Sequence, residues 1–221
     1  HLGFDFTYDK SLYDRLSQGT AREVREWQFS KEACHDHCAH FIENHDEPRA
    51  LAAFGREKSR AAAMVIASMP GLRFFHDGQL EGKKARHVVQ LGREREEVQD
   101  LSLLGFYDRL FHGLRLPVFR EGICQPVSMA PAGEGNASFE NLLACAWHHD
   151  EEWWWVVINY SPLRSQGRAL FPLPPGHEDQ VVLADNWGGE TYVRLVKEIR
   201  KQGLYVELAP WEAHLFQVRK T

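Results

Sequence analysis

The chain has 221 residues, of which 43% are hydrophobic, so it can bury a substantial core in one or two domains. Its formal net charge is -5 and its Lys and Arg residues are scattered, which argues against nucleic acid as a partner. The longest apolar run, residues 61–67, is far shorter than the roughly 20 residues that a membrane-spanning helix needs, so no membrane span is expected.

The chain begins at His1 rather than Met, and neither a basic nor an apolar leader follows. We therefore expect that a leader has been removed or that the sequence is the interior of a longer chain. Four cysteines are too few for a disulfide scaffold. They leave the cellular compartment unknown, with the cytoplasm slightly favoured over secretion.

The first half of the chain alternates between short strand patterns and helical patterns. Strands are predicted at residues 3–9, 41–42 and 72–76, and helices at residues 12–16, 21–29, 56–69 and 101–114. Strand, helix and strand recur at a spacing of about 30 residues, which is typical of right-handed βαβ units in a parallel sheet. The sequence therefore predicts an α/β unit over residues 1–116.

After residue 116 the predicted strands are short, and Pro, Gly, Ser and Asn turns separate them. Strands are predicted at residues 118–123, 142–148, 153–160, 168–171, 180–184, 204–208 and 214–218. Apolar residues alternate with polar ones in the 204–208 segment, which is typical of a half-buried antiparallel strand. We therefore expect an all-β domain over residues 117–221, built as an antiparallel β-sandwich.

Residues 40–49 (HFIENHDEPR) bring a short apolar strand to an abrupt end in polar side chains. Asn44, His45 and Asp46 follow the apolar pair directly, and a second polar cluster (HDGQLE, residues 76–81) follows the next predicted strand. The carboxyl ends of parallel strands are where α/β barrels keep their active sites. Short polar side chains can also simply cap a turn, but the carboxylates that flank the histidine favour a functional site.

These segments resemble the α-amylase family of glycoside hydrolases and transglycosylases. Residues 41–46 (FIENHD) are similar to the motif that ends the seventh barrel strand, and residues 70–82 (PGLRFFHDGQLEG) to the eighth strand and its loop. Residues 3–9 (GFDFTYD) resemble the sixth strand, and residues 211–216 (WEAHLF) the closing strand of the C-terminal β-domain. The resemblance therefore implies α/β plus all-β architecture: the last three βα units of a catalytic TIM barrel, then the β-sandwich.

The resemblance also implies roles for the residues of this motif. Asp46 would be the catalytic carboxylate that stabilises an oxocarbenium-like transition state, and His45 would donate hydrogen bonds to the same sugar ring. Asn44 would line that sugar subsite, and Arg49 would bind substrate indirectly by ordering the rim of the pocket. The substrate would be an α-glucan such as starch or a maltooligosaccharide, cleaved by a retaining mechanism.

A complete barrel needs about 250 residues, far more than the 116 that precede the predicted β-domain. A retaining glycosidase also needs a nucleophile and an acid/base, which this family carries on its fourth and fifth strands. Neither strand has a counterpart here, and Glu43 and Glu47 lie in no matching motif. We therefore expect an α-amylase-type enzyme that is inactive without its partner, the missing N-terminal part of the barrel. The alternative is a non-catalytic carbohydrate-binding or scaffold protein derived from an amylase.

No cofactor or metal is expected in this chain, because the resemblance places any calcium site in the missing part. Residues 34–40 (CHDHCAH) are nevertheless dense in metal-ligand types, and zinc takes four such ligands in tetrahedral geometry. They lack a second paired cluster at a known spacing. We therefore interpret the segment as a polar loop with small buried thiols.

The tryptophans and the first strand also have a predicted environment. Trp153, Trp154 and Trp155, with Trp187 and Trp211, could stack on sugars, but alternation along a strand places Trp154 opposite its neighbours, so packing in a core is favoured.

Three parallel strands that do not close into a barrel leave unpaired edges. We therefore expect the strand within residues 3–9 to have an open edge, or to pair with another copy or a missing segment.

Overall fold

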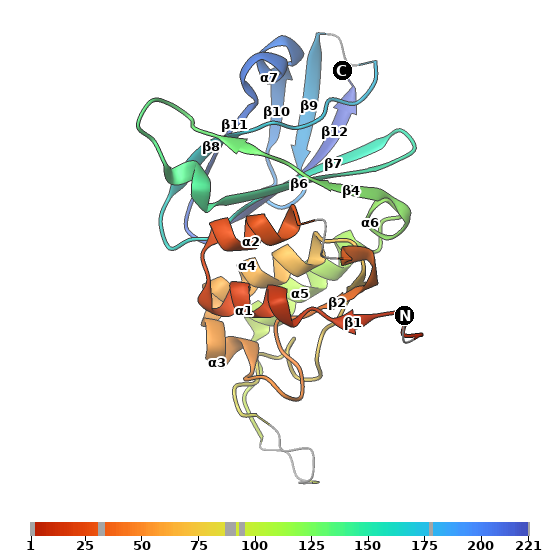
Figure 1. Cartoon of the computed structure of the whole chain (residues 1–221), viewed down its shortest axis with the longest axis vertical. Helices are drawn as coiled ribbons and strands as arrows, with labels where there is room; N and C mark the ends of the chain where they lie inside the picture. The colour runs from red at the N-terminus through yellow and green to blue at the C-terminus, as the bar shows by residue number, and fades with distance from the viewer. Residues whose placement is uncertain (1–2, 31–33, 87–91, 93–95, 177–178, 221) are drawn as a thin grey trace.

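The computed structural model describes residues 3–30, 34–86, 92, 96–176 and 179–220. Helices and a small parallel sheet form one end of the molecule, and antiparallel sheets form the other (Figure 1). The elements of the first end are β1 (Thr7–Tyr8), α1 (Lys10–Gln18), α2 (Ala21–Gln28), the 3-10 helix η1 (His35–His37), β2 (Cys38–His40), α3 (Ala50–Phe54), α4 (Arg56–Ala67), β3 (Leu72–Arg73) and α5 (Leu101–Leu114).

The parallel sheet has the strand order β1-β2-β3, with β2 in the centre. Tyr8 pairs with Ala39, and His40 pairs with Arg73, both in parallel. Among the described strands β1 has a partner on one side only, so the predicted open edge is confirmed.

The prediction of a strand at residues 41–42 is wrong, because the paired segment ends at His40. Beyond it, Phe41 and Ile42 are buried in the core that α1 and α4 also line. An apolar run therefore marked burial here rather than strand pairing. The other two strands of this sheet lie where predicted but are shorter, with two paired residues each.

Local sequence explains where the helices begin. The Asp9 side chain accepts a hydrogen bond from Leu12 N at the start of α1, and Thr20 forms a capping box with Glu23 at the start of α2. Asp100 caps α5, whose bounds match the predicted 101–114. The short helix α3 was not predicted, since five residues are too few to show a helical period.

The second end contains α6 (Val118–Glu121), β4 (Ile123–Pro126), β5 (Met129–Ala130), the 3-10 helix η2 (Ser138–Asn141), β6 (Leu142–His149), β7 (Glu152–Asn159), β8 (Ser165–Ala169), β9 (Gln180–Asp185), β10 (Thr191–Leu195), α7 (Val196–Gln202), β11 (Leu204–Leu208) and β12 (Ala213–Lys220). Six strands form an antiparallel sheet in the order β10-β9-β12-β7-β6-β4, and three form a second one, β11-β8-β5. Strands β6, β7, β9, β11 and β12 lie close to their predicted positions.

The predicted strand at residues 118–123 is wrong in its first part. Pro117 already has helical dihedral angles (φ -54°, ψ -36°) and starts α6, and strand pairing begins only at Ile123. Val118 and Phe119 are buried, so this helical turn satisfies their hydrophobicity without a strand. Strands β5 and β10 and helix α7 were not predicted.

Two hydrophobic cores share the six-stranded sheet. One lies between the sheet and the helices of the first end, and the other lies between the two antiparallel sheets. Trp154 belongs to the first core and Trp155 to the second, where its ring stacks on Phe171 at 4.5 Å. The predicted alternation and core packing of these tryptophans are therefore confirmed. No helix within the described ranges is long and apolar enough to cross a membrane.

One backbone carbonyl joins the two ends of the molecule. The oxygen of Ser68, which follows the last turn of α4, accepts a hydrogen bond from Trp147 Nε1 at 2.8 Å. The thiols of Cys124 and Cys145 lie 3.5 Å from the same oxygen. Polar contacts as well as a core therefore connect residues on both sides of residue 116.

Candidate functional site

The loop between β2 and α3 carries the predicted site residues. Asn44 is buried, and its Oδ1 accepts hydrogen bonds from Asp46 N at 2.8 Å and Glu47 N at 3.0 Å. An asparagine that bonds the backbone two and three residues ahead fixes a tight turn. The Asn44 oxygen therefore caps the turn, as the alternative interpretation has it. This turn positions the residues that follow.

His45 and Asp46 lie at the exposed tip of this turn. Their side chains are 49% and 74% exposed, and His45 Nε2 lies 3.2 Å from Asp46 Oδ2. The structure therefore brings the two predicted sugar-contacting groups together. An accessible carboxylate beside an imidazole can accept and donate hydrogen bonds to sugar hydroxyls.

Arg49 is placed differently from its neighbours in the motif. Its side chain is only 4% exposed, and its Nη1 lies 2.6 Å from Glu43 Oε1 and 2.9 Å from His76 Nδ1. The guanidinium also donates to the backbone oxygens of Asp77 and Ala85. Arg49 therefore ties the loop after β2 to the loop after β3.

Glu43 was not predicted as a site residue, yet it organises this loop. Its carboxylate is 1% exposed, pairs with Arg49 and accepts from Ala50 N at 2.6 Å, which begins α3. A charged residue that directly follows a fully buried apolar pair needs a buried partner. The position of Glu43 after Phe41 and Ile42 is therefore the feature of the sequence that could have indicated its role. Glu43 thus holds the loop from beneath and has no exposed face for a ligand.

The surroundings of the turn are aromatic and partly charged. Tyr13 stacks on Phe41 with ring centroids 5.3 Å apart. Burial, and then the negative charge of Glu47, raise the pKa of Tyr13 to about 12, so its hydroxyl stays protonated. Glu47 itself is 18% exposed and lies 3.3 Å from the half-exposed Lys10.

The segment at residues 34–40 does not gather its cysteines into a site. Cys34 is exposed and Cys38 is partly exposed, so the prediction of small buried thiols is wrong. The structure instead places His35 and His40 beside Asp9, a residue far from them in the sequence. Among the described residues, this is the cluster of three or more potential metal ligands whose atoms come within 4.8 Å of one another.

Comparison with known proteins identifies the fold. No protein-family model and no curated protein sequence match this chain. Solved structures do match: a noncanonical maltogenic α-amylase from Thermotoga neapolitana has a TM-score of 0.70 and 17% identity, covering 97% of this chain and 51% of its own. An α-amylase from Geobacillus thermoleovorans, complexed with acarbose, has a TM-score of 0.74 and 14% identity, and the match covers 98% of this chain and 48% of the amylase chain.

A third α-amylase, from H. orenii, has a TM-score of 0.67 and 18% identity over 98% of this chain and 49% of its own. This chain has an α-amylase fold. It spans about half the length of the solved amylases that it matches, which is consistent with the C-terminal part implied by the sequence. In this α-amylase fold, residues 41–46 directly follow β2, and residues 70–82 contain β3 and the loop that Arg49 contacts.

Proposed function

We propose that the chain is the C-terminal portion of an α-amylase-family glycoside hydrolase that acts on α-glucans by a retaining mechanism. In this proposal residues 1–116 are the last three βα units of a TIM barrel, and residues 117–221 are a β-sandwich domain. The observation that carries it is the position of the His45–Asp46 pair, at the carboxyl end of the central parallel strand in an α-amylase fold. Acarbose is bound by one matching α-amylase, and maltotriose by a variant of AmyP, another protein with a matching structure.

Asp46 would supply a fixed negative charge near the anomeric carbon, where positive charge develops in the transition state. His45 would donate a hydrogen bond to a hydroxyl of the same sugar. The Asn44 turn holds the backbone of Asp46, and the buried pair of Glu43 and Arg49 anchors the loop. Because these groups are held before substrate arrives, little reorganisation is needed during the reaction.

The nucleophile and the acid/base would come from the missing N-terminal part of the barrel. The edge of β1 is where that part would pair, and three aromatic side chains are exposed there: Phe4 (77%), Phe6 (44%) and Tyr8 (48%). Exposed aromatic rings beside unpaired backbone groups are typical of a surface that another segment covers. The chain would therefore be inactive alone.

Hydrolysis of maltooligosaccharides tests this proposal. The chain alone should release no reducing sugar, whereas the product of its complete reading frame should. In that longer product, Asp46→Asn should lower kcat by about 10²- to 10³-fold, since it removes one group that stabilises transition-state charge. Glu47→Gln is the matched control, because this neighbouring carboxylate pairs with Lys10 and should leave kcat unchanged.

Two results would contradict the proposal. One is steady sugar release by the chain alone that Asp46→Ala abolishes, because the chain would then contain a complete catalytic site. The other is full activity of the Asp46→Asn variant of the longer product, because Asp46 would then have no catalytic role.

A groove beside α5 favours the second candidate, a non-catalytic carbohydrate-binding protein. The groove has a volume of about 390 Å³, and the aromatic rings of Phe106, Trp187 and Trp211 line it together with Arg60 and Glu57. Aromatic faces with a few charged groups suit sugar rings. Under this candidate the chain alone binds maltotriose, Trp187→Ala abolishes that binding, and Asp46→Asn does not change it.

A further inference from the structure

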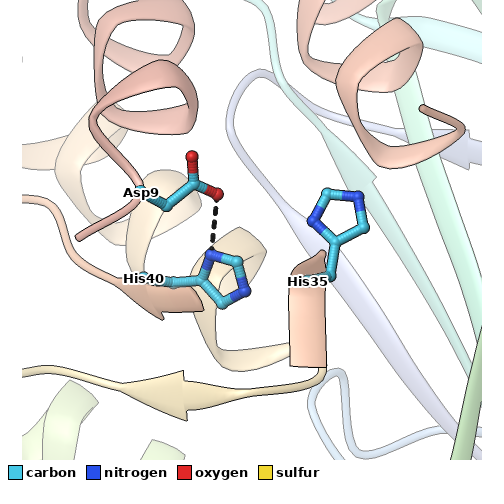
Figure 2. A group of neighbouring side chains, drawn as sticks. All are labelled: Asp9, His35 and His40. Atoms are coloured by element: carbon cyan, nitrogen blue, oxygen red, sulfur yellow. Dashed lines mark hydrogen bonds and ion pairs between the residues drawn. The ribbon is translucent and has the colours of Figure 1, made fainter. Parts of the chain in front are cut away.

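Asp9, His35 and His40 come from three different elements and meet at one point. Asp9 directly follows β1, His35 begins η1 and His40 ends β2. Figure 2 shows the three side chains turned toward one another, and one ligand atom from each lies within 4.8 Å of the others. Asp9 and His40 are buried, and His35 is partly buried.

In each of the three side chains, the polar atom that faces away from the cluster forms a hydrogen bond with a backbone group. His40 Nε2 lies 2.8 Å from the carbonyl oxygen of Pro70, and His35 Nε2 lies 3.1 Å from that of Trp27. A carbonyl only accepts hydrogen bonds, so both Nε2 atoms carry the proton and donate it. Asp9 Oδ1 accepts from Leu12 N at 2.9 Å. The inward-facing atoms are then His35 Nδ1, His40 Nδ1 and Asp9 Oδ2.

Hydrogen bonding within the protein leaves one of these three atoms unsatisfied. His40 Nδ1 lies 3.0 Å from Asp9 Oδ2, and Trp27 Nε1 donates to the same oxygen at 3.1 Å. His35 Nδ1, by contrast, is buried and has no hydrogen-bond partner among the residues that the structure describes. With its proton on Nε2, this atom presents a lone pair to the Asp9 carboxylate and the His40 ring. A buried lone pair without a donor is uncommon in a folded protein and calls for an explanation.

We propose that Asp9, His35 and His40 form a binding site for a divalent transition-metal ion of the zinc type. The ligand atoms are Asp9 Oδ2, His35 Nδ1 and His40 Nδ1, and a fourth position is open to water. Two imidazoles and a carboxylate are an established zinc donor set, and ligand histidines usually donate their other N–H to a carbonyl, as both do here. Binding displaces the proton between His40 Nδ1 and Asp9 Oδ2, which leaves to solvent.

Access and charge fit this assignment. A cavity of about 230 Å³ reaches His35, with Cys34, Asp36 and Gln28 also in its lining. Burial lowers the pKa of His35 from its ordinary value. The ion would hold the edge strand β1 and the central strand β2 to η1, so its role is structural. The inference departs from the expectation that this chain holds no metal, and it does not depend on the proposed glycosidase activity.

Metal titration of the chelator-treated chain tests the proposal. Zn²⁺ should bind with one ion per chain and raise the melting temperature. His35→Gln should weaken binding by at least about tenfold. The matched control is His37→Gln, two residues away in the same η1, whose ring contacts the Asp5 carbonyl at 3.2 Å outside the cluster. This control should bind Zn²⁺ like the wild type.

Co²⁺ provides a readout that does not depend on a variant. The wild-type chain should give the visible absorption of a low-coordinate Co²⁺ site without a thiolate charge-transfer band, and the Cys34→Ser/Cys38→Ser double variant should give the same spectrum. Absence of stoichiometric binding to the wild type would overturn the proposal. So would unchanged binding in folded His35→Gln, or loss of binding in the cysteine double variant.

Discussion

Replacing Glu43 by Gln tests whether the buried pair with Arg49 holds the candidate sugar-binding loop. Both side chains are at most 4% exposed, and their charged atoms lie 2.6 Å apart. Removing one partner of a buried pair leaves the other charge uncompensated and costs about 3–5 kcal/mol. Arg49 keeps two carbonyl acceptors, at Asp77 and Ala85, so we expect the lower end of that range, about 3 kcal/mol. For a chain of this size, such a loss lowers the melting temperature by about 6–12 °C.

Urea denaturation followed by tryptophan fluorescence measures this loss. Glu26→Gln is the control, because Glu26 pairs with Arg22 at the surface, where the two side chains are 61% and 66% exposed, and should lose about 0–1 kcal/mol. The double variant Glu43→Gln/Arg49→Met should be more stable than Glu43→Gln alone, since it leaves no buried charge unpaired. Equal losses for the Glu43 and Glu26 single variants would refute the reasoning.

Two further predictions concern pH dependence and the open edge. Burial alone would raise the pKa of Asp185, but its hydrogen bonds with His214 and with the backbone of Gly188 and Leu215 lower the pKa below its usual value. The ionised Asp185 carboxylate therefore stabilises the fold above the unfolded-state pKa of about 3.9, and this stabilisation is lost as pH falls through the lower folded-state pKa. The difference in free energy of unfolding between the wild type and Asp185→Asn should thus become smaller below about pH 4. A pH-independent gap in urea titrations would contradict this. At the edge of β1, Phe6→Lys should reduce concentration-dependent self-association of the chain in light scattering, because a charge discourages edge pairing. A wild type that stays monomeric at every concentration would contradict it.

The sequence predicted elements whose patterns are local. The bounds of α5 follow from an apolar face at three- and four-residue steps and from the cap at Asp100, both of which are visible in one window. The strand at residues 41–42 was misplaced because full burial and strand pairing produce the same apolar run. Helix α7 was missed because only Val196 and Ile199 face the core and the rest of its residues are polar.

In the candidate site, too, the residues that are close in sequence were predicted and the contacts between distant segments were not. Asn44, His45 and Asp46 were predicted because they are consecutive, and the structure keeps them together on one turn. The link between Arg49 and His76 depends on two loops that meet only when β2 pairs with β3. Asp9 likewise reaches His40 because β1 and β2 pair in parallel, a registration that no local pattern encodes.

The hydrogen bond from Trp147 to the Ser68 carbonyl limits how this protein can be recombined. A chimaera cut near residue 116 would graft a foreign β-domain onto the end of α4. If that domain lacked a donor at the position of Trp147, the buried carbonyl would lose its strongest partner, at a cost of about 1–3 kcal/mol. The two ends of the molecule are therefore matched parts, and exchange between relatives should succeed only when the indole and the helix end are transferred together.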